Sequence, residues 1–327
     1  MQRIFFRLLL LGTVVFFSSW GFLVHRTIHQ LAVYELPAPM RPFFYKNMNY
    51  LVDSAGRADQ RRNRDSAEAS RHFIDLEAFG DSAAWKMPFT WEAAVKTFTK
   101  DSLLKYGYVP YHIITMKNGL TGAFRSANKD SILFYAVDLA HYIGDANVPL
   151  HSSLNYDGQL SNQHGLHSLW ESMVPELELD QYNLYSGHKA KYLQNPEQVI
   201  WDCIRRAHQL LPDVFNKEIE ATREFVDSAK FRTQVRRGRE VKSFTPAFAK
   251  AYSKLLGQTI NDQLLNSSAM IADFWYTAWV DAGKPELPGA GGFEKTDKTA
   301  LKKEQKAWRK NELIEKKLLL SRKQAQQ

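Results

Sequence analysis

Apolar residues recur three and four positions apart along most of the chain, which is the pattern of amphipathic helices. Alternation typical of strands is scarce. Segment 90–107 begins at Thr90, a favourable N-cap residue, and ends at Gly107, while Pro37 and Pro212 interrupt other helical stretches. The pattern therefore predicts an all-α protein with a single multi-helix domain. The expected helices span 25–36, 90–107, 128–145, 197–225 and 245–283, and a polar loop is expected at 152–163.

The first nineteen residues differ from this helical region. They combine Arg3 and Arg7 with a short uncharged apolar run and two serines, which is the layout of a secretory signal peptide. We therefore expect residues 1–19 to be a signal peptide and the protein to be exported, to the periplasm or beyond the cell. Phe17 occupies a position where a small residue is preferred, so the alternative is a retained N-terminal membrane anchor.

The C-terminal region also differs in composition. Residues 284–327 begin with the linker-like "KPELPGAGGF" and continue as a Lys-rich segment that offers little to bury. We expect a linker and a basic tail, solvated or partly disordered. The alternative is peripheral contact with an anionic membrane or cell-envelope polymer.

The net charge of +8 comes from the two ends of the chain. From Lys284 onward there are twelve Lys and Arg residues against six Asp and Glu residues, and Arg3 and Arg7 supply the remainder. The expected domain, residues 20–283, is therefore close to neutral, with little electrostatic attraction for polynucleotides beyond Arg61, Arg62 and Arg64. The single cysteine, Cys203, excludes an internal disulfide, so stability must come from the core or from metal.

Histidines and carboxylates gather in short motifs. In "HYIGDANVPLH", His141 and Asp145 are four residues apart, hence on one helix face, and His151 follows a turn. "LHSLWE" repeats the arrangement with His167 and Glu171. One such pair is common on helices without metal, but two pairs joined by a third histidine favour a metal site, and His/Asp/Glu sets suit zinc.

Further candidate ligands lie upstream, with His25 in "WGFLVH", Asp59 in "RADQRR" and His72 in "RHFID". In this order the motifs resemble the zinc-dependent phospholipase C and single-strand nuclease superfamily, over the whole of residues 20–283. The resemblance implies an all-α fold with three zinc ions in one cleft. It assigns one zinc to the amine and carbonyl of Trp20 with His25, a second to Asp59, His72 and His141 with Asp145 bridging the two, and a third to His151, His167 and Glu171.

The resemblance also implies roles in catalysis. Trp20 can offer its amine only if the signal peptide is cleaved directly after Ser19. Asp59 would be a general base as well as a ligand, and Arg62 would lie near the phosphate, unless it is a solvated member of the "RRNR" run. A zinc-activated water would then hydrolyse a phosphodiester.

Two further residues bear on the substrate. Phe73 matches an aromatic that stacks on a base in the nucleases, with core packing as the alternative, and Asp75 matches a carboxylate that reads the base edge. The motif around His141 and the short interval from His151 to His167 resemble the phospholipases. The spacing from Trp20 to His25 resembles the nucleases.

We therefore expect a phospholipase C-like phosphodiesterase that acts on a phospholipid. A single-strand nuclease or nucleotidase is the alternative, and a non-catalytic zinc-binding protein is a more remote one. No obligate protein partner is expected.

Overall fold

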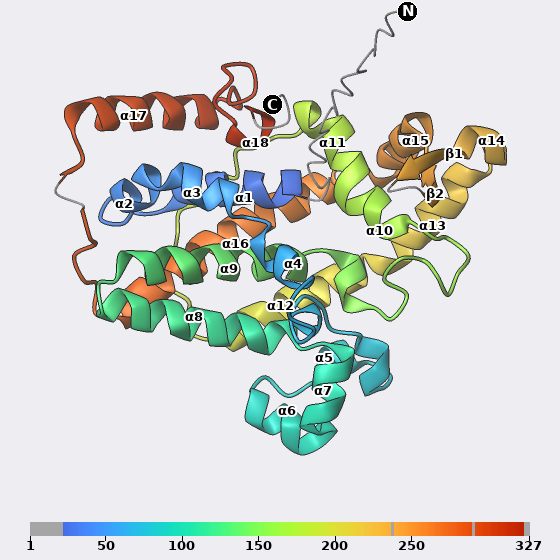
Figure 1. Ribbon diagram of the computed structural model, residues 1–327, viewed down its shortest axis with the longest axis horizontal. Helices are drawn as coiled ribbons and strands as arrows, with labels where there is room; N and C mark the ends of the chain where they lie inside the picture. Colours follow the sequence, from blue (N-terminus) through green and yellow to red (C-terminus); the bar gives the residue numbers. More distant parts are fainter. Residues whose placement is uncertain (1–21, 237–238, 290–291, 324–327) are drawn as a thin grey trace, which may run out of the picture.

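Helices dominate the computed structural model, which describes residues 22–236, 239–289 and 292–323 (Figure 1). The expected signal peptide, its cleavage site and the expected ligand Trp20 lie outside these residues. The long helices are α1 (Phe22–Glu35), α8 (Val109–Arg125), α9 (Lys129–Ala146), α12 (Pro196–Gln209) and α16 (Thr259–Asp281). No helix in the described ranges is long and apolar enough to cross a membrane.

The remaining helices connect and cover these five, and all of them except α17, with 15 residues, are shorter. They are α2 (Arg41–Lys46), α3 (Met48–Asp53), α4 (Arg57–Arg61), α5 (Ala83–Lys86), α6 (Trp91–Phe98), α7 (Lys100–Tyr106), α10 (Leu166–Ser168), α11 (Val174–Glu178), α13 (Leu211–Thr222), α14 (Asp227–Lys230), α15 (Pro246–Leu256), α17 (Lys295–Arg309) and α18 (Leu320–Lys323). Single turns of 3-10 helix form η1 (Ala69–Arg71), η2 (Leu76–Phe79), η3 (Pro149–Ser152) and η5 (Leu179–Gln181), and η4 (Leu169–Met173) is a π-helical turn.

Helix α16 is at the centre of the core, where it packs against α1, α8 and α9. Trp275 on α16 is fully buried, stacks on Phe44 with ring centroids 4.7 Å apart, and donates its indole N–H to the carbonyl of Ala136 on α9. A large aromatic buried with its polar atom satisfied contributes apolar contact without a desolvation cost. The core therefore fixes α1 and α9 relative to each other.

The all-α prediction is confirmed, but two expected helices are each broken in two where no break was expected, and a third is broken beside the expected interruption at Pro212. The expected helix 90–107 breaks at Thr99, which has a φ of 66°, and 245–283 breaks at Gly257, which has a φ of 61°. The expected helix 197–225 breaks at Leu210, and the ring of Pro212 lies in the first turn of α13, where a missing N–H costs nothing. The expected helices over 25–36 and 128–145 agree with α1 and α9.

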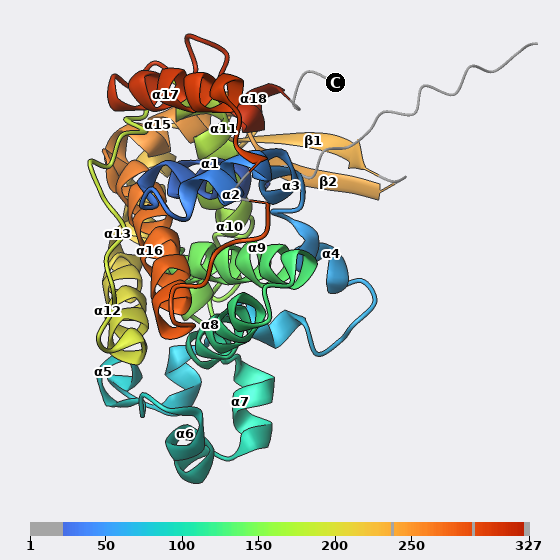
Figure 2. The ribbon, with the colours of Figure 1, turned by 90° about the vertical axis from the view of Figure 1, so that its left-hand side faces the viewer.

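A β-hairpin interrupts the helices. Strand β1 (Phe231–Arg236) pairs antiparallel with β2 (Arg239–Phe244), with Phe231 opposite Phe244. The hairpin extends away from the helical body (Figure 2). The sequence pattern did not predict it.

The C-terminal segment packs against the domain, so the expectation that it has little to bury is wrong for residues 292–323. In α17, Leu301 and Trp308 are buried, and Glu304 accepts hydrogen bonds from Tyr34 and Tyr45. Further along, Gln30 of α1 donates to the carbonyl of Leu318 and accepts from the N–H of Leu320. The segment therefore holds α1 from the side opposite α16, as Figure 1 shows for α17.

Candidate metal centre

Eight of the expected ligands converge although they come from seven elements of the chain. His25 is on α1, Asp59 on α4, His72 directly follows η1, and His141 and Asp145 are on α9. His151 is in η3, His167 in α10 and Glu171 in η4. Their ligand atoms form three groups, each within 4.8 Å: His25, His141 and Asp145; Asp59, His72 and His141; and His151, His167 and Glu171.

The first two groups share His141 and centre on Asp145. Asp145 Oδ1 is 3.4 Å from His25 Nε2, while Oδ2 is 2.8 Å from His72 Nδ1 and 3.4 Å from His141 Nε2. Asp59 closes the second group, 3.7 Å from His72 and 3.8 Å from His141. The two oxygens of Asp145 thus point to different histidines, as a carboxylate that bridges two ions must.

Glu171 organises the third group and links it to the first. Its Oε2 is 2.7 Å from His167 Nε2 and 3.5 Å from His151 Nε2, and its Oε1 is 3.4 Å from His25. The π-helical turn that carries Glu171 ends at Met173, just before Pro175, which has no N–H to donate to the Glu171 carbonyl. Single π turns occur frequently at functional sites.

Most of these separations suit a shared metal better than direct hydrogen bonds. Nitrogen and oxygen ligands at the zinc distance of about 2.0–2.1 Å lie about 3.3 Å apart when they are arranged tetrahedrally. His25 Nε2 is 3.4 Å from Asp145 and 3.4 Å from Glu171, and His151 Nε2 is 3.5 Å from Glu171. These distances are close to the ligand–ligand separation around zinc and too long for good hydrogen bonds. His151 Nε2 is buried and has no hydrogen-bond partner. The residues therefore fit zinc.

Backbone carbonyls orient three of the imidazoles. The Nδ1 atoms of His141, His151 and His167 lie 2.8, 2.7 and 3.1 Å from the carbonyl oxygens of Ala55, His72 and Tyr156. Because a carbonyl only accepts, each Nδ1 must carry the proton. Each Nε2 lone pair is then free to face the centre of the site, as in most histidines that bind metal.

Gly144 allows His25 to approach α9. The His25 ring stacks on the His141 ring with centroids 4.2 Å apart. A Cβ at position 144 would lie 2.9 Å from the His25 ring and 2.9 Å from Ile28. The glycine in "HYIGD" therefore has a packing reason that the ligand pattern alone does not give.

Glu68 is a residue of the candidate site that the sequence reasoning missed. It is fully buried, and its Oε1 lies 3.4 Å from His72 Nε2 and accepts a hydrogen bond from Tyr142. Arg61 and Arg71 pair with the same carboxylate. Carboxylates behind a ligating histidine fix its orientation and raise its basicity. A signal was present, because Glu68 and His72 have the same four-residue spacing as His141 and Asp145.

The arginines in and directly after α4 differ in their partners and exposure. Arg57 and Arg61 pair with Asp138 of α9 at 2.6 and 2.8 Å, which fixes α4 and therefore Asp59 beside α9. The expectation that Arg61 is available to attract a substrate is thus wrong, because buried carboxylates hold it. Arg62 is half-exposed and lies 3.6 Å from Asp59.

The charges in the cluster are strongly coupled. Burial would raise the pKa of Asp145, but His141 and His151 nearby hold it well below its ordinary value. Burial would lower the pKa of His25 and His72, yet contacts with Asp145, and with Glu171 or Glu68, raise these values to about 10 and about 9. The carboxylates therefore stay ionised, and the site attracts cations, whether protons or metal ions.

A cavity of about 1100 Å³ opens over the cluster. Among its lining residues are Asp59, Arg62, His72, Phe73, Asp75, Asp145, His151, His167 and Glu171. Asp59 remains one-third exposed (33%). Burial, followed by the neighbouring charge of Glu77, raises the pKa of Asp75 to about 7. The expected substrate-binding residues Phe73 and Asp75 therefore line the same cavity as the ligands.

A scan of known protein families finds none that matches the chain, and a search of curated proteins finds no significant match. The chemistry of the site must therefore support the function by itself.

Proposed function

We propose that the protein is a zinc-dependent hydrolase of phosphodiester bonds, phospholipase C-like, with three zinc ions in the cavity. Trp20 and His25 would hold one ion, and Asp59, His72 and His141 a second, with Asp145 between them. His151, His167 and Glu171 would hold the third. The proposal includes export and cleavage after Ser19, because only cleavage there frees the Trp20 amine.

One observation carries this proposal: three groups of potential ligands lie together, two of them share His141, and six of the eight residues line one open cavity. A structural zinc site needs four ligands in a closed shell. Here the groups overlap through His141 and Glu171 also contacts His25, while Asp59 is exposed to the cavity. Adjacent metal sites that open to a cavity are typical of enzymes that use metal ions for hydrolysis.

The side chains suit specific steps. Bound zinc ions would supply Lewis acidity and lower the pKa of a water molecule. The carboxylate of Asp59 is exposed beside the cluster, where it can accept a proton from such a water molecule. Arg62, on the rim of the same cavity, presents a guanidinium that can bind a phosphoryl oxygen in bidentate fashion. Asp75 has a pKa of about 7, so near neutral pH it can donate or accept a hydrogen bond.

The alternative substrate, single-stranded nucleic acid, is favoured by the placement of Phe73 beside Asp75. Both line the cavity, where an aromatic ring and a carboxylate can bind a base. The motif around His141, the short interval before His167 and the near-neutral domain favour a phospholipid. We therefore keep phospholipid as the proposed substrate.

Parallel assays of the purified mature protein test the proposal. Phosphatidylcholine, single-stranded DNA and RNA, and a soluble aryl phosphodiester are each incubated with protein that has been treated with a chelator and then reconstituted with zinc. We expect zinc-dependent cleavage of the aryl phosphodiester and of phosphatidylcholine. Cleavage of the nucleic acids alone would overturn the phospholipid proposal, and a zinc-replete protein inert on every substrate would favour the non-catalytic alternative.

A further inference from the structure

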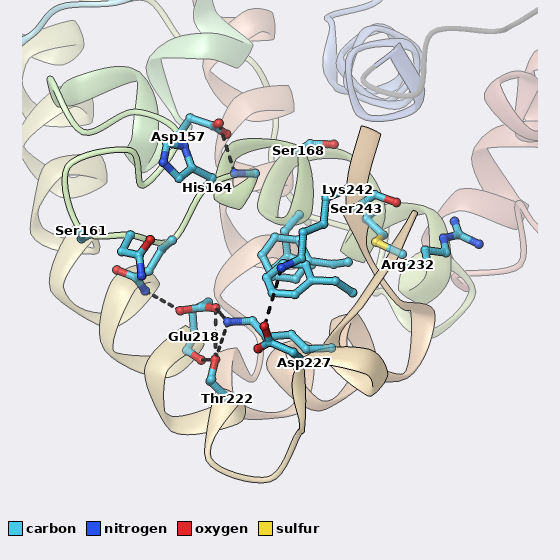
Figure 3. A pocket seen from close by; sticks show the side chains of 18 of the residues that line it. Asp157, Ser161, His164, Ser168, Glu218, Thr222, Asp227, Arg232, Lys242 and Ser243 are labelled. Atoms are coloured by element: carbon cyan, nitrogen blue, oxygen red, sulfur yellow. Dashed lines mark hydrogen bonds and ion pairs between the residues drawn. The ribbon is translucent and has the colours of Figure 1, made fainter. Parts of the chain in front are cut away.

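A second cavity, of about 780 Å³, adjoins the cavity above the metal centre. Asp157 and Ser168 line both cavities. Loop residues Ser161 and His164 border one side, Glu218 and Thr222 of α13 the floor, and the β-hairpin the other side (Figure 3). A substrate or surface at the hairpin is therefore next to the proposed catalytic site.

The base of the hairpin is rigidly anchored. The buried ammonium of Lys230 is 2.6 Å from Glu218 Oε1 and lies over the rings of Phe231, Phe244 and Phe248, 4.9, 5.7 and 5.1 Å from their centroids. Phe244 also stacks on Phe248. An ion pair enclosed by aromatic rings fixes the hairpin to α13 and α15, so the extended hairpin has a defined direction (Figure 2).

The hairpin region concentrates positive charge, whereas the rest of residues 20–283 contains 23 Lys and Arg residues against 27 Asp and Glu residues. Residues 226–244 contain six Lys and Arg residues against two Asp and Glu residues, and one of the six, Lys230, is neutralised by its buried ion pair with Glu218. The side chain of Lys242 is 58% exposed, and its partner Asp227 is 3.8 Å away at an exposed position. Each basic residue near an anionic lipid surface strengthens binding about fivefold.

Exposed aliphatic side chains lie within the same region. Val226 is 70% exposed and Val235 is 71% exposed, while Ile219 and Val241 are exposed beside the cavity. Binding of single-stranded nucleic acid uses exposed aromatic faces for base stacking. The ring of Phe231 is instead covered by Lys242, whose Nζ is 3.9 Å from the ring centroid. Aliphatic and basic side chains together suit a lipid surface better than bases.

From this combination we infer that the hairpin and the adjoining residues Ile219 and Val226 form a docking surface for a bilayer of anionic phospholipid. The surface lies beside the metal cavity, so docking would bring that cavity close to membrane phospholipid, the substrate class of this inference. This inference rests on the proposed function for its catalytic meaning, but the docking itself requires no catalysis.

Vesicle binding tests the inference with the full mature chain after removal of metal by a chelator. Sedimentation is measured with vesicles of phosphatidylcholine, with and without phosphatidylglycerol. We expect binding only to the vesicles that contain phosphatidylglycerol. Val226→Ser/Val235→Ser should weaken it about tenfold and Lys242→Gln about fivefold. The double variant should fold normally, because both valines are already exposed and serine is a good N-cap at position 226 of α14.

The matched control is Lys302→Gln/Lys303→Gln on α17, which removes two exposed lysines from the other basic region of the chain. Loss of vesicle binding in this control, with no loss in the hairpin variants, would overturn the inference. Tighter binding of a single-stranded oligonucleotide than of vesicles, lost in Lys242→Gln, would also overturn it. Docking through the hairpin by a protein that hydrolyses no phosphodiester would instead contradict the proposed function and leave the docking surface intact.

Discussion

The two halves of the metal centre are built in different ways. The inner group (His25, Asp59, His72, His141 and Asp145) relies on the long helices α1 and α9, and all of its members except Asp59 are almost fully buried. The outer group (His151, His167 and Glu171) is carried by a 3-10 turn, a short helix and a π turn, and is only partly buried. Packing against α16 fixes the long helices that carry most of the inner group. Backbone carbonyls orient His141 of the inner group and both histidines of the outer group, which no long helix carries. We therefore expect the inner group to be the more rigid and the outer group to lose its metal more readily.

The largest expected effect comes from Asp145→Asn, which removes the charge shared by three histidines of the inner group. We expect both inner zinc ions to be lost and zinc-dependent hydrolysis to fall about a thousandfold, because several kcal/mol of charge stabilisation disappear. Elemental analysis should still find zinc in the outer group. Full zinc content in this variant would contradict a bridging role for Asp145.

His167→Ala should have a smaller effect, confined to the outer group. It removes the imidazole nearest to Glu171 Oε2, so we expect loss of one zinc ion per chain, with the inner zinc retained. Hydrolysis should fall about a hundredfold, and metal content and rate should be measured on the same preparation. Simultaneous loss of all zinc would show that the two groups bind metal as one unit, against the distinction drawn above.

Glu68→Gln sharpens the comparison, since Glu68 supports the inner group without belonging to it. The affinity for zinc should fall about tenfold to a hundredfold, the typical effect of losing a carboxylate behind a ligating histidine. Competition with a chromophoric chelator measures this affinity. Glu220→Gln is the control, because exposed Glu220 pairs, among the residues that the structure describes, with partly buried Lys217 on α13. Equal affinities for zinc in the two variants would show that Glu68 does not support the metal site.

The smallest expected effect on the metal centre comes from Gln30→Ala, on the face of α1 that meets the C-terminal segment. This variant leaves the carbonyl of Leu318 and the N–H of Leu320 without their partner, at a cost of about 2 kcal/mol in the free energy of unfolding. Denaturant unfolding measures it. Because α1 carries His25, the affinity of the inner group for zinc should also fall about threefold relative to the wild-type protein. An unchanged unfolding free energy would show that the segment does not stabilise α1.

Much of the metal centre could be predicted because its spacing is local. His141 with Asp145 and His167 with Glu171 lie on single helical turns, and their faces follow from a period of 3.6 residues. The meeting of α1 with α9 depends on tertiary packing through α16, which spacing alone does not give. The resemblance to a known family supplied that part of the prediction, whereas the network around Glu68 became evident only in the structure.

The errors in the fold prediction also have physical reasons. Leu301, Gln305 and Trp308 lie on one face of α17, but the many lysines around them suggested a solvated tail. Thr99 adopts a positive φ that no sequence signal announces, whereas Gly257 could have indicated a break. The hairpin was missed because β1 is only six residues long and offers just two apolar positions, Phe231 and Val235, to mark the alternation.

Crystals of the mature zinc-bound protein, measured on both sides of the zinc absorption edge, test the central claim most directly. We expect anomalous peaks within each of the three ligand groups, with the peak next to His25 also contacting the amine of Trp20. Peaks absent from these groups, or located only at surface histidines such as His164, would contradict the account of a zinc-dependent hydrolase.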